Sequence, residues 1–168
     1  MIDDIPAPHP APPLRCLQLA LPPYRFIPGK HPHPSKDQDG HQHLIPPVSP
    51  SVEWAKWETN EAWLRGLDLF DYRYYWEAHE QLEPIWLMIP QEDPHRDFVQ
   101  GIIQAAAFRL KWHMGHTSPA MKLKETATRR LLNSRDQLGG CIWGVDIDSL
   151  TLQMRQVVKK GGWLTLTS

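Results

Sequence analysis

Apolar residues recur every three or four positions along the second part of this 168-residue chain, and this period predicts helices there. The third predicted helix is apolar on nearly all sides, which is typical of a central, buried helix. All eight tryptophans lie after residue 50 and are expected to pack the core. No strand pattern competes with the helical one. The predicted helices cover residues 51–70, 72–88, 95–114, 118–138 and a short segment that begins at Asp148.

A few residues mark the ends or interruptions of these helices. Ser51 is the expected cap of the first helix, and Asp148 is the expected cap of the last. Pro84 lies inside the second helix and should kink it, because its ring clashes with the carbonyl of Glu80. Gly115 is placed to end the third helix, since glycine is the usual residue just past a helix end.

The first 50 residues have a different composition, because they hold 13 of the 17 prolines. Proline removes a backbone donor and blocks helix continuation, so this segment is expected to be extended and polyproline-like. Some of its residues are apolar enough to dock on a folded body, namely Tyr24, Phe26, Ile27, Leu44 and Ile45. The predicted fold is therefore all-α, a compact bundle of about five helices over residues 51–168 with a Pro/His-rich arm over residues 1–50.

Charge and composition narrow the classes of partner. The net charge is −1 and the pI about 6.7, so no basic surface predicts nucleic acid or an anionic membrane. No apolar stretch is long enough to span a bilayer, and the acidic N-terminus lacks the apolar region of a secretory signal. Cys16 and Cys141 match no ligand spacing and fit idle thiols in a reducing compartment. We therefore expect a cytoplasmic protein, with a homo-oligomer left open.

The second helix carries an unusual group of polar residues. His79 and Glu83 are four positions apart and share one helix face, whereas Glu77 and Glu80 are three apart and share another. Three carboxylates and an imidazole within two turns can bind a divalent metal or perform acid–base chemistry. Only the pair of His79 and Glu83 lies on the tryptophan stripe of this helix, so this pair is expected to point inward.

The third helix offers polar residues that could face this group. Arg96, Gln100 and Gln104 are spaced by four, and they are expected either to face the second helix or to form a solvent stripe. Amides are poor ligands for transition metals. Since only one helix combines carboxylates with a histidine, the match to a two-metal bundle site is partial.

A histidine-rich loop lies in the arm, with four histidines between His31 and His43. The prolines between them hold the backbone extended, and no cysteine accompanies them, so a closed zinc site is not expected. The loop is interpreted as a solvated segment or as a cover for the helical body. Whether one of these histidines reaches the second helix is left open.

Three functions are compatible with these residues, and whether the protein is an enzyme is left open. The favoured one is a non-catalytic module in which a buried polar network specifies helix register. The second is a metal-assisted hydrolase with His79 and Glu83 as ligands of a divalent metal and Glu80 as general base. The third is a partner-binding protein whose arm docks elsewhere. The network would comprise Glu77, His79, Glu83, Arg96, Gln100 and Gln104.

Two runs of residues resemble the motifs of a known family. The run Tyr75-Trp76-Glu77-Ala78-His79-Glu80, preceded by Leu69-Phe70-Asp71, resembles the core motif of the bacterial and archaeal domain-of-unknown-function family 309. Residues 96–106 resemble its second motif, and the likeness extends over about residues 62–132. The resemblance implies a compact helical bundle and no established activity.

This chain departs from the family pattern at two positions. Arg73 stands where glycine is usual, and Pro84 stands where the helix normally continues. Since arginine tolerates positive φ poorly, a tight turn before the second helix is in doubt.

Overall fold

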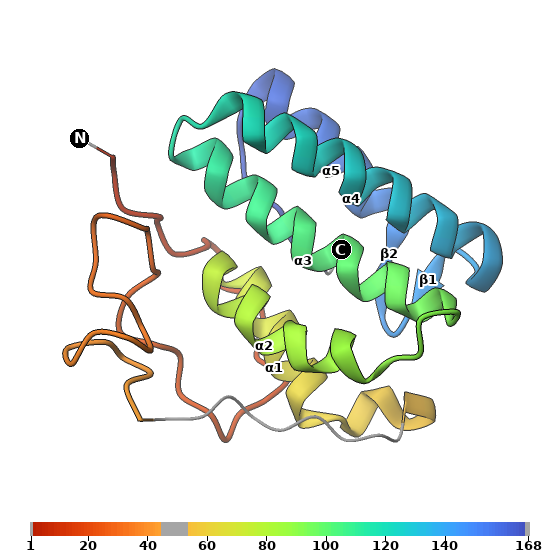
Figure 1. Cartoon of the computed structure of the whole chain (residues 1–168), viewed down its shortest axis with the longest axis horizontal. Helices are drawn as coiled ribbons and strands as arrows, with labels where there is room; N and C mark the ends of the chain where they lie inside the picture. Colours follow the sequence, from red (N-terminus) through yellow and green to blue (C-terminus); the bar gives the residue numbers. More distant parts are fainter. Residues whose placement is uncertain (1, 45–53, 167–168) are drawn as a thin grey trace.

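Five α-helices make up most of the computed structural model, which describes residues 2–44 and 54–166 (Figure 1). A short 3₁₀-helix precedes them, and a small antiparallel hairpin lies before the last helix. The prediction of an all-α bundle of about five helices is therefore confirmed. The elements are η1 (Trp54–Thr59), α1 (Glu61–Asp71), α2 (Tyr75–Met88), α3 (Pro94–His113), α4 (Thr117–Leu138), β1 (Cys141–Ile142), β2 (Val145–Asp146) and α5 (Ile147–Lys160).

The first predicted helix is wrong in its extent, because a cap divides it. The side chain of Asn60 accepts a hydrogen bond from the backbone N–H of Trp63, and this cap starts α1 at Glu61. The segment before it forms only the 3₁₀-helix η1. The predicted cap Ser51 lies outside the described residues.

The start of α5 also differs from the prediction. Asp146, and not Asp148, caps this helix, since its carboxylate accepts from the backbone N–H of Ser149 at 2.8 Å. The hairpin before it was not predicted, because each strand has only two residues and cannot show an alternating pattern. Trp143 and Gly144 form its turn, with φ of 45° and 80°, as a two-residue hairpin requires.

The turn before α2 forms in spite of its arginine. Arg73 adopts a φ of 68°, in the left-handed region that favours glycine. The backbone N–H groups of Arg73 and Tyr74 donate to the carbonyls of Phe70 and Leu69, both at 2.8 Å. The helix that follows continues through Pro84 to Met88.

Helix α3 is the centre of the bundle, as its apolar composition predicts. It packs against α2 and α4, and α5 in turn contacts α4 (Figure 1). Its inward side chains are fully buried, among them Phe98, Ile102 and Phe108. Among the described residues, no helix combines the length and apolar character needed to cross a bilayer.

Two glycines allow neighbouring helices to approach closely. A Cβ atom at Gly66 of α1 would lie 2.4 Å from a side-chain carbon of Leu82 on α2. A Cβ at Gly101 of α3 would lie 2.7 Å from the side chain of Leu131 on α4. Because packed interiors have little free space, both contacts depend on the missing side chain.

Replacing Gly66 by alanine should therefore destabilise the protein, by about 1–2 kcal/mol, because overpacking exceeds the gain in helix propensity. Urea unfolding measures this change. Gly140→Ala is the control, since a Cβ at Gly140 meets nothing within 4 Å. Equal stability of the two variants would contradict the close contact between α1 and α2.

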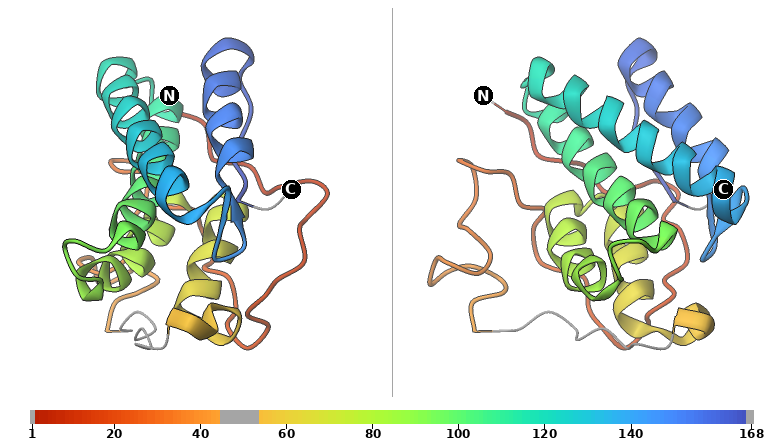
Figure 2. Two further views of the ribbon diagram at one scale, coloured as in Figure 1. Left: turned by 90° about the vertical axis from the view of Figure 1, so that its right-hand side faces the viewer. Right: turned by 45° about the vertical axis from the view of Figure 1, so that its right-hand side comes forward.

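The N-terminal arm lies along the outside of the helices (Figure 2). Phe26 and Ile27 are buried, and Ile5 joins the same core, so this part of the arm docks as expected. Tyr24 is half-buried. Leu44, by contrast, is 88% exposed, so the expectation that it docks is wrong. Ile45 lies outside the described residues.

Two buried carboxylates on α1 hold the arm. Asp68 accepts from the backbone N–H of Arg15 at 3.0 Å, from that of Cys16 at 2.8 Å and from the Arg15 guanidinium at 2.8 Å. Asp71 accepts from the same guanidinium at 2.8 Å and from the backbone N–H of Leu166. Since both carboxylates are fully buried, they depend on these donors from the two ends of the chain.

Replacing Asp68 by asparagine should destabilise the protein by about 2–3 kcal/mol, because a buried ion pair is broken without any change of side-chain volume. Chemical denaturation measures the loss. Asp148→Asn, which disturbs only the exposed pair of Asp148 with Arg135, should cost far less. Similar losses in both variants would show that Asp68 does not anchor the arm.

Candidate functional site

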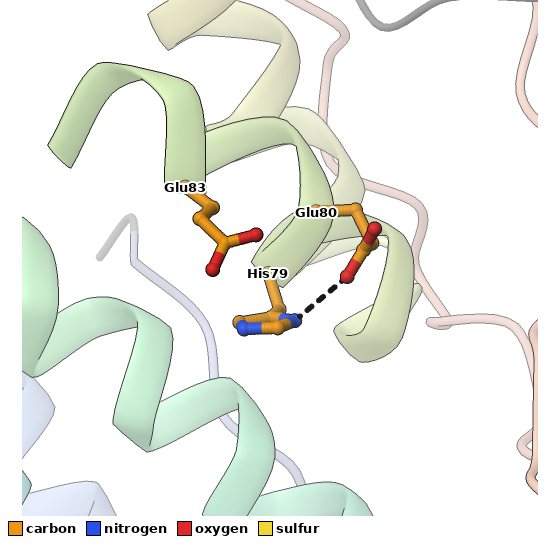
Figure 3. A group of neighbouring side chains, drawn as sticks. All are labelled: His79, Glu80 and Glu83. Carbon is orange, nitrogen blue, oxygen red and sulfur yellow. Dashed lines mark ion pairs between the residues drawn. The ribbon is translucent and has the colours of Figure 1, made fainter. Parts of the chain in front are cut away.

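Helix α2 presents three polar side chains on one side. Figure 3 shows the imidazole of His79 between the carboxylates of Glu80 and Glu83. The Nδ1 atom of His79 lies 3.3 Å from Oε1 of Glu80. One donor atom from each of the three residues lies within 4.8 Å of the others. His79 and Glu80 are about one-third exposed, with side-chain values of 34% and 37%.

A cavity of about 280 Å³ adjoins this group, between α2 and α3. His79, Glu83 and Trp86 line it from α2, and the amides of Gln100 and Gln104 line it from α3. Apolar side chains complete the wall, namely Ile103, Ala107 and Leu123. The structure thus brings together four of the predicted site residues, but Glu77, Glu80 and Arg96 do not line this cavity.

Glu77 belongs to a different site, on the face of α2 that the arm covers. Its side chain is fully buried, with 0% exposure. Its Oε1 atom accepts from the backbone N–H of Phe26 at 3.0 Å and lies 2.9 Å from Nε2 of His41. The expectation that only the pair of His79 and Glu83 points inward is therefore wrong. The position of Glu77 relative to the tryptophan stripe gives no information about a distant segment that covers it.

Arg96 stabilises the end of α2. Its guanidinium lies 4.4 Å above the ring of Trp86 and donates to the carbonyls of Trp86 and Ile89. A cation at the C-terminal end of a helix satisfies free carbonyls and complements the helix dipole. Arg96 therefore fixes the end of the helix that carries the cavity wall, and it contributes no group to the cavity itself.

Two polar atoms of cavity-lining residues are buried without a hydrogen-bond partner in the part of the chain that the structure describes. They are Oε1 of Gln104 and Nε1 of Trp86. Buried polar atoms of folded proteins nearly always have a partner, in the protein or in ordered water. Two residues of the cavity wall thus each keep one buried polar atom, a donor and an acceptor, without a partner among the described residues.

The donor set of His79, Glu80 and Glu83 fits a divalent cation. One imidazole nitrogen and two carboxylate oxygens suit zinc and similar ions, which they bind at about 2.0–2.2 Å. Ligand atoms around such an ion lie roughly 3.0–3.5 Å apart, as these bond lengths require. The side chains are partly exposed, so they can close this distance by small rotations. Three protein ligands leave a coordination position for water or a ligand.

Comparison with known proteins identifies the domain but no activity. Residues 63–123 match the model of the family described as "Domain of unknown function (DUF309)". This match confirms, over residues 63–123, the resemblance seen in the two sequence motifs. The matched segment extends from α1 into α4 and includes all the side chains of the cavity wall. No curated protein and no solved structure matches the chain.

The residues of α1 and α2 that bind the arm carry only a weak signal in the sequence. Asp68 and Asp71 are acidic residues three positions apart in the mainly apolar second half of α1, and this spacing is the signal that the sequence offers. His41 was included only as one of four loop histidines. Its partner cannot be chosen from the sequence, because 35 residues separate it from Glu77 and no local period relates them.

Replacing His41 by alanine should destabilise the protein by about 2 kcal/mol, because Glu77 keeps a buried carboxylate and loses its side-chain partner. Thermal unfolding measures this change. The control is His116→Ala, since His116 is exposed and its side chain makes no capping hydrogen bond. Unchanged stability of the His41 variant would contradict the buried contact between the arm and α2.

Proposed function

We propose that the domain binds a divalent cation between His79, Glu80 and Glu83 and holds a small ligand in the adjoining cavity. The observation that carries this proposal is the position of the three donors, within 4.8 Å of one another beside a cavity of about 280 Å³. Residues that only specify helix register would be expected to lie in the core, whereas His79 and Glu80 are about one-third exposed.

The cavity wall supports a ligand with both polar and apolar parts. Glu83 and His79 belong to the cation group and to the cavity wall, so an open coordination position faces the cavity. The amides of Gln100 and Gln104 offer donors and acceptors, while Trp86 offers an apolar surface. A small molecule bound to the ion through one oxygen would lie against these three side chains.

A hydrolase is the catalytic form of this proposal. A bound divalent ion lowers the pKa of its water towards neutrality. Glu80 is the candidate general base in this form, since its carboxylate lies 3.3 Å from His79, beside the proposed place of the ion. The same position also allows Glu80 to act as the third ligand of the ion. The cation site is proposed whether or not the domain is catalytic.

A non-catalytic module is the second candidate, and the buried carboxylates favour it. Asp68, Asp71 and Glu77 are fully buried, and each accepts hydrogen bonds from the arm. All three carboxylates specify where the arm docks, and this role requires no substrate. Under this second candidate function the domain is a scaffold, and the arm is one part of its folded structure.

We also propose a cytoplasmic location, supported by two free cysteines, one of them exposed. The net charge of −1 supports the absence of nucleic-acid and membrane partners. A homo-oligomer is compatible with both candidate functions.

The cation proposal is tested by titrating the purified protein with Zn²⁺ and with Mn²⁺ in a calorimeter, paired with elemental analysis. His79→Ala should weaken binding by about tenfold or more, as loss of a direct ligand does. The free energy of unfolding of this variant should change by less than about 0.5–1 kcal/mol, because the side chain is partly exposed.

His116→Ala serves as the matched control, an exposed histidine outside the group, and should bind the ions as the wild type does. Absence of stoichiometric binding in the wild type would refute the cation site. A large loss of stability in His79→Ala without any metal would instead favour the non-catalytic module.

A further inference from the structure

Arg73 occupies a backbone conformation that arginine rarely adopts. Its φ of 68° would cost glycine nothing, whereas a side chain in this region raises the free energy by about 1 kcal/mol or more. Strained residues of this kind persist where the side chain has a use. The turn between α1 and α2 would form equally well with glycine, so the use lies in the guanidinium.

The guanidinium of Arg73 has no acidic partner. Its Nη1 atom donates to the carbonyls of Pro6 and Ala7, at 3.0 and 3.1 Å. Its Nε atom is buried and has no hydrogen-bond partner among residues 2–44 and 54–166. Within the same residues, no carboxylate lies within 4.0 Å of its nitrogen atoms. Within the described residues this cation therefore has only neutral partners, two carbonyls and the ring of Trp163, and no carboxylate compensates its charge there.

A second arginine increases the excess of positive charge. Arg109 of α3 is only 5% exposed, and its guanidinium lies 3.8 Å from the centre of the Trp163 ring, over which Arg73 also lies at 4.7 Å. Its Nε atom donates to the carbonyl of Gly162, but Nη1 has no partner in the described part of the chain. Burial lowers the pKa of Arg109, and the neighbouring charge of Arg73 lowers it further.

Arg73 also lines a cavity of about 690 Å³. The other wall is the proline-rich segment of residues 8–14, and the C-terminal segment contributes Thr165. Among the described residues, the ionisable side chains on its wall are His9, Arg15 and Arg73, and none of these is acidic. Since Arg15 is paired with Asp68 and Asp71, Arg73 is the arginine of the described wall that has no carboxylate partner.

We propose that this cavity binds a small molecule that carries an oxyanion, a carboxylate or a phosphate, with Arg73 as its anchor. The planar guanidinium is suited to such groups, and its Nη2 atom, which makes no hydrogen bond within residues 2–44 and 54–166, can donate to an oxyanion while Nη1 keeps its contacts with the arm. The proline segment offers an apolar wall to the rest of the molecule. Arg109 packs on Trp163, is not part of the cavity wall, and adds to the positive potential without contacting the ligand. This site is separate from the cation site on α2.

The test uses the full chain and three probes with the same ring, namely phenyl phosphate, benzoate and phenol, titrated in a calorimeter at constant ionic strength. Binding of phenyl phosphate or benzoate, with phenol at least about tenfold weaker, is the expected result, because the anion provides the charged contact. The tighter of the two anions identifies the headgroup. Equal binding of phenol, or no binding of either anion, would overturn the proposal.

Arg73→Gly is the decisive variant, since glycine adopts the observed φ without strain and lacks only the guanidinium. It should weaken anion binding by about tenfold or more. Arg129→Gln removes one positive charge from an exposed position of α4 and should bind as the wild type does. Wild-type affinity in Arg73→Gly would refute the anchor.

Detachment of the arm would also remove the cavity, so its docking is measured in the same variants. Hydrogen exchange of the Cys16 amide reports it, because this N–H donates to Asp68. If Cys16 stays protected in Arg73→Gly, loss of binding is assigned to the guanidinium. If it does not, Arg73→Lys decides, since it keeps the charge and should bind several-fold more weakly than the wild type. Wild-type affinity in Arg73→Lys with the arm docked would contradict recognition by a guanidinium.

Discussion

The burial of three carboxylates on α1 and α2 determines how the rest of the chain is arranged. Asp68, Asp71 and Glu77 are fully buried, and an ionised carboxylate in such a place requires donors. The helices cannot supply them, since their own N–H groups are used within the helices. Arg15, Phe26 and the C-terminal segment supply them instead. The proline-rich arm is therefore part of the fold, although it contains no helix or strand in its described residues.

Local patterns predicted the helices well, because an apolar period of three to four is a property of neighbouring residues. The central position of α3 followed from its composition alone, and Gly115 and Gly139 end their helices as glycine usually does. The predicted starts of two helices are wrong, because a single capping hydrogen bond decides at which residue each helix begins. Asn60 starts α1 later than expected, and Asp146 starts α5 earlier.

Only the part of the candidate site that lines the cavity could be predicted from the sequence. The four-residue spacing predicted a shared helix face for His79 and Glu83 and another for Gln100 and Gln104, but it left open whether the two amides face the second helix or solvent. In the structure all four residues line one cavity. Glu77 could not be placed in this way, because the segment that covers it lies far away in the sequence. The helical period shows which residues of a helix share a face and how apolar that face is. It cannot show that a distant arm covers a polar face of the helix.

The contacts of the arm also impose an order on folding. Most contacts of a helical bundle join residues near in sequence, which makes such bundles fast to form. Here the Cys16 N–H can form its hydrogen bond only once Asp68 is in place. Leu166 is separated from its partner Asp71 by 95 positions. Closing loops of this length costs entropy that only later contacts offset. The helices are expected to assemble first, with their carboxylates hydrated, and the two ends of the chain to displace that water in the last step.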